Sequence, residues 1–134
     1  MKTFVLDSSA LLAYLENKDG SAKLEDLLTE ALRGRVAVFM SSVNYGETFA
    51  VLQRVFGRDR AVSTLATLYQ LPWRIEDATR LRALAAADVK EQYKLHYSDA
   101  FAAALALEYK ATLVTSDSDF RRFGRSVPVL WLKS

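Results

Sequence analysis

The run FVLDSSALL at residues 4–12 gives the first indication of the fold. Its three leading apolar residues predict a short buried strand that ends at Asp7. Ser8 and Ser9 then offer hydroxyl groups that can cap a helix, and the apolar residues after them keep a helical spacing. The run therefore predicts a strand followed directly by a helix, with a carboxylate at the junction.

The rest of the chain repeats this alternation of strand and helix. We expect strands at 3–6, 36–40, 71–75, 111–114 and 127–132. We expect helices at 8–15, 21–34, 42–57, 59–69, 76–94 and 99–110, with Ser21, Asp59 and Ser98 as N-caps of three of them. Uniformly apolar strands that alternate with helices indicate a mostly parallel sheet, of roughly five strands here, covered by helices on both faces.

The composition is that of a globular chain. Of the 134 residues, 51% are hydrophobic and 25% are charged, which excludes the signature of intrinsic disorder. No repeat or Pro/Gly/Ser-rich linker divides the sequence, so we expect residues 1–134 to form a single domain. Because 18 Lys and Arg stand against 16 Asp and Glu, any contact with nucleic acid should be local.

Several site types and locations are excluded by what the sequence lacks. The absence of cysteine removes disulfides, thiolate metal sites and a cysteine nucleophile, and a single histidine, His96, removes multi-histidine zinc sites. The N-terminal apolar run is too short for a signal peptide, and no apolar run approaches the ~20 residues of a membrane span. We therefore expect a cytoplasmic protein without a membrane partner.

Four acidic residues occupy related positions in this pattern. Asp7 ends the first strand, Asp117 follows the fourth, and Asp99 and Glu47 lie early in helices. Each has an ordinary explanation on its own, such as a helix cap, a turn or a solvated surface. Taken together, they fall where the carboxyl edge of a parallel sheet gathers its ligands. Carboxylates without His or Cys suit Mg²⁺ or Mn²⁺, and these ions act mainly on phosphate esters.

Four segments of the sequence resemble the PIN domain family of metal-dependent ribonucleases, and in particular the VapC-type toxins of type II toxin-antitoxin pairs. The segments are FVLDSSALL at 4–12, SVNYGE at 42–47, LHYSDAFAAALA at 95–106 and LVTSDSDF at 113–120. Each is weak alone, but all four occur in order over essentially the whole chain. The resemblance implies a three-layer α/β/α sandwich and an endoribonuclease that leaves a 5′-phosphate and a 3′-hydroxyl.

The resemblance also implies a metal site. Asp7 and Asp99 would be the most direct ligands of Mg²⁺ or Mn²⁺, with Glu47 and Asp117 completing the catalytic cluster directly or through water. Asp119 matches the second acid of a signature that follows the fourth strand, and its role in the family is less uniform. The implied partners are an RNA substrate, a cognate VapB-type antitoxin whose tail enters the groove, and a second copy in a homodimer.

Basic and aromatic residues near these motifs are candidates for RNA contact. Arg121 and Arg122, together with Arg125, follow the last acidic motif and could bind flanking phosphates. A solvated surface is at least as good an explanation for a second group, which comprises Arg54, Arg58 and Arg60. Base stacking is possible, beside ordinary core packing, for three tyrosines: Tyr14, Tyr45 and Tyr97. Hydroxyl groups that could orient the acids or cap helices belong to Ser8, Ser9, Ser98, Thr115 and Ser116.

Other functions have weaker support. An aspartate-nucleophile phosphohydrolase would need a second Asp where Ser9 stands, and neither a G-x-S-x-G elbow nor a glycine-rich nucleotide-binding motif occurs. A general base role for His96 is not required, because a metal ion would already activate the water. Two alternatives stay open beside the toxin, namely a stand-alone RNA-processing nuclease and a non-catalytic PIN-fold interaction module.

Overall fold

The computed structural model describes residues 1–132 and contains a five-stranded sheet in which every neighbouring pair is parallel. The strand order is β3-β2-β1-β4-β5. The strands are β1 (Lys2–Leu6), β2 (Val36–Ser41), β3 (Arg74–Glu76), β4 (Thr112–Thr115) and β5 (Val129–Trp131). The expected α/β fold is confirmed, and the sheet is fully rather than mostly parallel.

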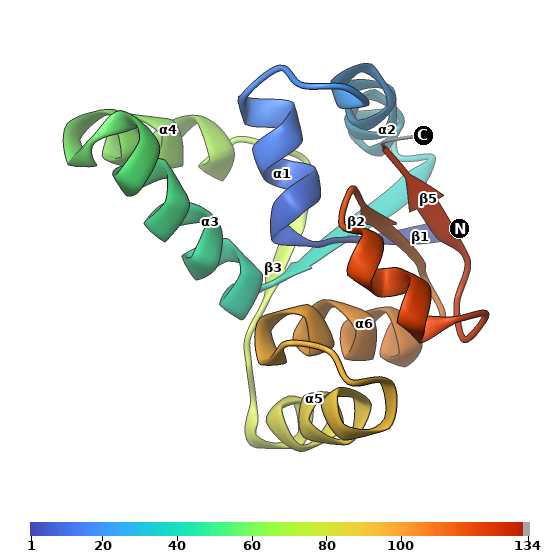
Figure 1. The fold of residues 1–134 in the computed structure, drawn as a ribbon. Coiled ribbons are helices and arrows are strands. Elements are labelled where there is room, and N and C mark those ends of the chain that lie inside the picture. The colour runs from blue at the N-terminus through green and yellow to red at the C-terminus, as the bar shows by residue number, and fades with distance from the viewer. Residues whose placement is uncertain (133–134) are drawn as a thin grey trace.

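Helices lie on both faces of this sheet, which makes the three expected layers (Figure 1). The helices are α1 (Ser8–Leu15), α2 (Ser21–Leu32), α3 (Ser42–Phe56), α4 (Arg58–Tyr69), α5 (Arg80–Tyr93) and α6 (Tyr97–Tyr109), followed by the 3₁₀ helix η1 (Ser118–Phe123). One face is covered by α1 and α2 and the other by α6, with α5 packed against the outer side of α6, while α3 and α4 form a pair beside the sheet. Among residues 1–132 no helix combines the length and apolar character that crossing a bilayer requires.

The two faces of the sheet are buried in two separate clusters, as expected when side chains alternate along strands. Val5 and Phe39 pack with α6, whereas Phe4, Leu6 and Val38 pack with α1 and α2. Helix α6 is buried over every residue from Asp99 to Ala106, and six of these eight residues are alanine or leucine. Small side chains let this helix lie close to the sheet, which fixes the position of its first turn.

Two strands are shorter than the apolar pattern predicts. The third begins at Arg74 rather than residue 71, because the N–H of Trp73 turns back to the carbonyl of Leu71 and Pro72 has no N–H. The fifth begins at Val129 rather than residue 127, although the carbonyl of Pro128 already accepts from Leu113. The helix predicted from residue 76 begins at Arg80, and Thr79 is its N-cap.

Three predicted N-caps are wrong. Gly20 and Gly57 occupy the N-cap positions expected for Ser21 and Asp59, each with a positive φ. The last helix begins at Tyr97 after His96, so Ser98 lies within its first turn and not before it. The hydroxyl of Ser98 is thereby free to contact another element.

Candidate metal centre

The five predicted acids all lie at the carboxyl edge of the sheet or in the helices that begin there. Asp7 follows β1 and is the N-cap of α1, and Asp117 follows β4 and is the N-cap of η1. Asp119 and Asp99 lie in the first turns of η1 and α6, and Glu47 lies in the second turn of α3. Parallel pairing of β1 with β4 places the first two junctions side by side.

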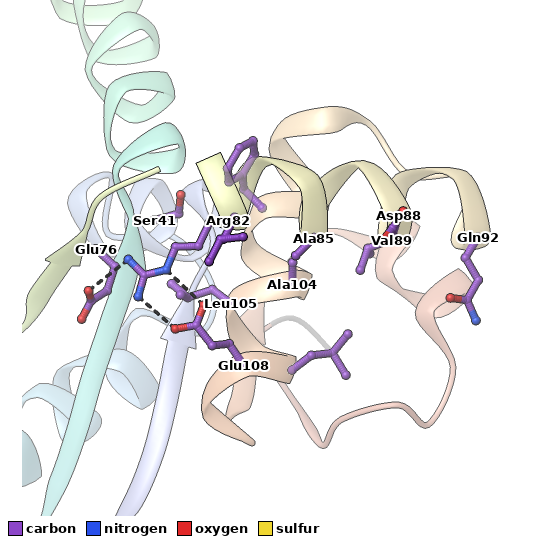
Figure 2. Close-up of a pocket in the computed structure, with 13 residues that line it drawn as sticks. Ser41, Glu76, Arg82, Ala85, Asp88, Val89, Gln92, Ala104, Leu105 and Glu108 are labelled. Atoms are coloured by element: carbon purple, nitrogen blue, oxygen red, sulfur yellow. Dashed lines mark hydrogen bonds and ion pairs between the residues drawn. The ribbon is translucent and has the colours of Figure 1, made fainter. Parts of the chain in front are cut away.

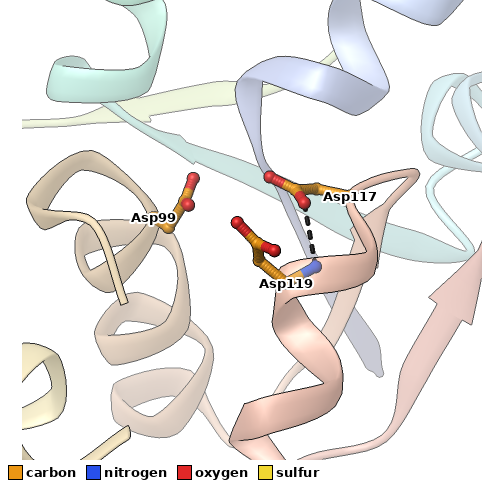
Figure 3. A group of neighbouring side chains, drawn as sticks. All are labelled: Asp99, Asp117 and Asp119. Carbon is orange, nitrogen blue, oxygen red and sulfur yellow. Dashed lines mark hydrogen bonds between the residues drawn. The ribbon is translucent and has the colours of Figure 1, made fainter. Parts of the chain in front are cut away.

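Asp99, Asp117 and Asp119 come together as a group of three carboxylates (Figure 3). One carboxylate oxygen from each lies within 4.8 Å of the oxygens offered by the other two. The N–H of Asp119 donates to Asp117 Oδ1 at 2.9 Å, which holds these two acids in one turn. Asp117 is therefore the N-cap of this turn.

Asp7 lies outside this three-carboxylate group and is only 1% exposed. Its Oδ1 accepts from the N–H of Ala10 at 2.8 Å, so the helix-capping explanation is correct for this residue. Hydroxyl groups of Ser9 and Thr115 also donate to its carboxylate. Burial raises the pKa of Asp7 from 3.8 to about 7, and these hydrogen bonds oppose that shift while the charge of Asp99 adds to it.

Glu47 also lies outside the three-carboxylate group, and two hydroxyl groups hold its carboxylate. Ser8 Oγ donates to its Oε1, and Ser98 Oγ donates to its Oε2 at 2.9 Å. The second contact uses the hydroxyl that the sequence had suggested as a helix cap. Glu47 is thus oriented by residues from α1 and α6 and is not a solvated surface side chain.

Electrostatic repulsion among the acids is strongest at Asp99. Its pKa is raised from 3.8 to about 6, first by burial and then by the charges of Asp117, Glu47 and Asp119, against an opposing effect of His96. Crowded carboxylates that resist ionisation are what a divalent cation stabilises. Their oxygen-only chemistry fits Mg²⁺ or Mn²⁺ and does not fit a zinc site built from His and Cys.

The basic candidates differ in their surroundings. Arg121 is exposed on η1, two residues after Asp119, whereas Arg122 donates to the carbonyl of Lys94 and so ties η1 to the end of α5. Arg58 and Arg60 lie over the rings of Phe49 and Phe56 where α3 meets α4. Figure 1 shows that this helix pair reaches away from the sheet, so the second basic group is not gathered at the acids.

The tyrosine side chains pack against other aromatic or apolar residues. Tyr45 makes an edge contact with Trp73, with ring centroids 6.1 Å apart, and Tyr97 makes one with Phe101 at 5.0 Å. Tyr14 packs partly buried beside two of the apolar clusters. Tyr97 keeps 44% of its surface exposed, so it is the most exposed of the three, and its hydroxyl donates to the carbonyl of Ala83 on α5.

Two hollows accompany these elements. One, of about 620 Å³, begins at Ser9 and Ser116 beside the acids and continues along Leu12, Val51 and Val55 of α1 and α3. The other, of about 560 Å³, lies between α5 and α6 on the opposite face of the sheet from α1 (Figure 2). At one end of this hollow, Arg82 forms ion pairs with both Glu76 and Glu108. The sequence pattern did not predict this network.

Comparison with known proteins agrees with this arrangement. The PIN domain profile matches residues 4–126. The chain belongs to the PIN domain family. Comparison with curated protein sequences gives no match.

Several solved structures are similar to this PIN domain. A VapBC2 structure from Rickettsia felis, bound to a DNA fragment of its promoter, has a TM-score of 0.73 and 16% identity over 96% of this chain and 97% of that one. FitAcB from Neisseria gonorrhoeae has a TM-score of 0.71 and 17% identity over 96% and 97%. Mycobacterium tuberculosis VapC20, described as a sarcin-ricin loop cleaving toxin, has a TM-score of 0.65 and 22% identity over 90% and 95%. These likenesses show the shared fold.

Proposed function

We propose that this PIN domain is a divalent-metal-dependent endoribonuclease of the VapC type. The observation that carries the proposal is the convergence of the Asp99, Asp117 and Asp119 carboxylates within 4.8 Å of one another. The raised pKa of Asp99 supports it, because burial and the charges of the neighbouring acids both disfavour its ionised form when no cation is bound. Membership in a family of metal-dependent nucleases supports the same chemistry.

We assign the metal site to five acids. Asp99 and Asp117 would bind Mg²⁺ or Mn²⁺ together with Asp119, which the geometry favours more than its variable role in the family suggests. Asp7 and Glu47 would contribute directly or through water. When bound, the ion would supply a water of lowered pKa and offset the charge that develops on the scissile phosphate.

The protein's own residues would orient this cluster. Thr115 and Ser9 hold the Asp7 carboxylate, while Ser8 and Ser98 hold Glu47. Such hydroxyl partners fix the direction of a carboxylate and keep it deprotonated when a cation is near. Hydrolysis at this site would leave a 5′-phosphate and a 3′-hydroxyl.

We propose that RNA reaches the acids across η1. Arg121 is exposed in η1, two residues after Asp119, and would bind a flanking phosphate, whereas Arg122 is already engaged by the Lys94 carbonyl and would contribute less. The exposed ring of Tyr97 offers a surface on which an unpaired base could stack. The positive charge that attracts RNA would therefore come from a few residues near the acids, because the net charge of the whole chain is only +2.

We further propose that the protein is the toxin of a VapBC-type pair. The hollow of about 620 Å³ that runs from Ser9 and Ser116 to Val55 would receive the tail of a cognate antitoxin, and Val55 is 53% exposed there. A tail seated in this groove would cover the approach to the acids. The likeness to R. felis VapBC2 and to M. tuberculosis VapC20, described as a toxin, supports this role.

We propose that residues 1–134 form one domain and that the protein is located in the cytoplasm. We also propose that it assembles as a homodimer. Leu81 and Leu84 of α5 and Leu107 of α6 are 78%, 60% and 39% exposed beside the second hollow, and a second copy would cover them. Sedimentation of the wild type against Leu84→Lys tests this assembly. Loss of a dimer only in the variant would support it.

The decisive experiment measures cleavage of structured RNA by the purified protein with Mg²⁺, with Mn²⁺ and with EDTA. We expect metal-dependent cutting that falls at least 100-fold in Asp7→Asn and in Asp99→Asn. Asp26→Asn, which changes an exposed acid of α2, is the control and should cut like the wild type. Circular dichroism would confirm that each variant is folded.

The outcome also separates the alternatives. A wild type free of copurified antitoxin that neither binds metal nor cuts RNA would disprove the nuclease and favour the non-catalytic interaction module. A nuclease that is active without any partner, encoded with no neighbouring antitoxin gene, would favour the stand-alone processing enzyme.

A further inference from the structure

A buried amide lies where α3 and α6 meet. Asn44, in the first turn of α3, has no exposed surface and is among the largest fully buried side chains of the protein. Its Nδ2 donates to the backbone carbonyl of Ser98 at 2.9 Å. The two residues are 54 positions apart, so this bond joins two elements that only the fold brings together.

The other half of the same amide is unsatisfied. Asn44 Oδ1 is buried and accepts no hydrogen bond from residues 1–132. A buried acceptor without a donor destabilises the folded state, and an apolar side chain of similar size at this place would avoid that cost. Asn44 therefore stabilises the fold poorly as a packing residue, and its useful contact is the bond that it donates.

That donated bond leads directly to the acids. Ser98 receives it on its carbonyl and donates its own hydroxyl to Glu47 Oε2 at 2.9 Å. Asp99 is the next residue, in the same first turn of α6. Glu47 lies one turn after Asn44 on α3. Two hydrogen bonds, both to Ser98, therefore join α3, which carries Glu47, to α6, which carries Asp99.

We propose that Asn44 is a positioning residue of the metal site. By holding the Ser98 carbonyl against α3, it sets the distance between Glu47 and Asp99 before any cation binds. The inference rests on the proposed function, because it concerns the geometry that the cation would meet. It adds to that function a residue that contacts neither the cation nor RNA.

The test compares Mn²⁺ binding by the wild type and by Asn44→Leu. Binding is measured by calorimetry and by the electron paramagnetic resonance signal of free Mn²⁺. Leucine has a similar size and removes both the donor and the unsatisfied acceptor, so we expect little change in melting temperature. Loss of a residue that orients metal ligands weakens metal binding by about 10- to 100-fold, and we expect a loss of this size. In the cleavage assay kcat should fall while KM for RNA changes little.

A matched control separates positioning from general destabilisation. Leu52→Ala truncates another buried residue of α3, 1% exposed and two turns beyond Asn44. This variant should lower the melting temperature and leave Mn²⁺ affinity unchanged when measured well below it. Asn44→Ala provides a second loss of the donor without added bulk and should weaken Mn²⁺ binding as Asn44→Leu does.

The possible results are distinct. Wild-type Mn²⁺ affinity in folded Asn44→Leu and Asn44→Ala would overturn the inference and leave the proposed nuclease intact. A loss of affinity in Leu52→Ala equal to that in the Asn44 variants would also overturn it, because the effect would then follow stability alone. A wild type that binds no Mn²⁺ would disprove the metal site and the positioning role with it.

Discussion

Ser98 Oγ donates a 2.9 Å hydrogen bond to Glu47 Oε2 and so ties the first turn of α6 to the second turn of α3. The two residues are 51 positions apart in the sequence. Because Asp99 directly follows Ser98, this bond links the acid of α3 to the acids that gather around α6 and η1. Its removal tests how far the orientation of Glu47 matters.

Ser98→Ala should reduce RNA cleavage about tenfold with only a small loss of stability. The Glu47 carboxylate keeps its second donor, Ser8, so it loses part of its orientation but not its charge. A net hydrogen bond of this kind is worth about 1 kcal/mol in the free energy of unfolding. Cleavage rates and urea denaturation would be measured in parallel. Ser63→Ala, which removes an exposed hydroxyl bonded to its own helix, should change neither.

The stability of the metal-free protein should fall as pH rises from about 4 to about 7. The pKa of Asp7 is 3.8 when unfolded and about 7 when folded, so the folded state binds the extra proton across this window. Each pH unit then lowers the free energy of unfolding by up to about 1.4 kcal/mol because of that proton. The raised pKa of Asp99 makes this slope steeper below about pH 6. Urea denaturation in EDTA at several pH values measures it.

Asp7→Asn should remove most of this pH dependence and be more stable than the wild type at pH 8 without metal. An amide can accept from the Ala10 N–H and donate to Thr115 without burying a charge. The same variant should lose RNA cleavage. Equal pH slopes in the two proteins would contradict the assignment of the slope to Asp7.

Arg121→Ala should weaken RNA binding and reduce its dependence on salt. A side chain that contacts one phosphate contributes about 0.7 to the slope of log K against log salt concentration for a single strand. Arg58→Ala is the matched control, because Arg58 is exposed at the start of α4, where α3 and α4 meet, and lies over the ring of Phe49. Binding would be followed by fluorescence anisotropy at several salt concentrations. An identical slope in the wild type and Arg121→Ala would exclude the phosphate contact.

Gly20→Ala should destabilise the fold by more than about 1 kcal/mol and leave the activity of folded molecules unchanged. Gly20 has a φ of +88°, and a Cβ at this position would clash with the backbone carbonyl of Leu132 beyond β5. At Gly34, which has a φ of +73°, an added Cβ would contact no other atom, so Gly34→Ala measures the cost of backbone strain without the clash. Thermal denaturation should therefore rank Gly20→Ala below Gly34→Ala.

The fold was largely predictable from local sequence. The apolar runs located all five strands, and their uniformly apolar composition predicted helices on both faces of a parallel sheet. Errors were confined to ends and caps, where one residue decides the outcome. Gly20 and Gly57 reach N-cap positions through positive φ values that the hydroxyl and carboxylate pattern does not report.

The sequence by itself determined which acids stand at strand ends and helix starts, because strand and helix periods are local properties. Only the tertiary structure decided how they are grouped: Asp99, Asp117 and Asp119 share one cluster, whereas Asp7 is buried beneath hydroxyl donors. It also decided the contacts of Glu47 and Asn44 with Ser98 and of Arg82 with Glu108, which span 26 to 54 residues along the chain. Such contacts depend on how α6 packs against the sheet and against α3, and no local pattern encodes that packing.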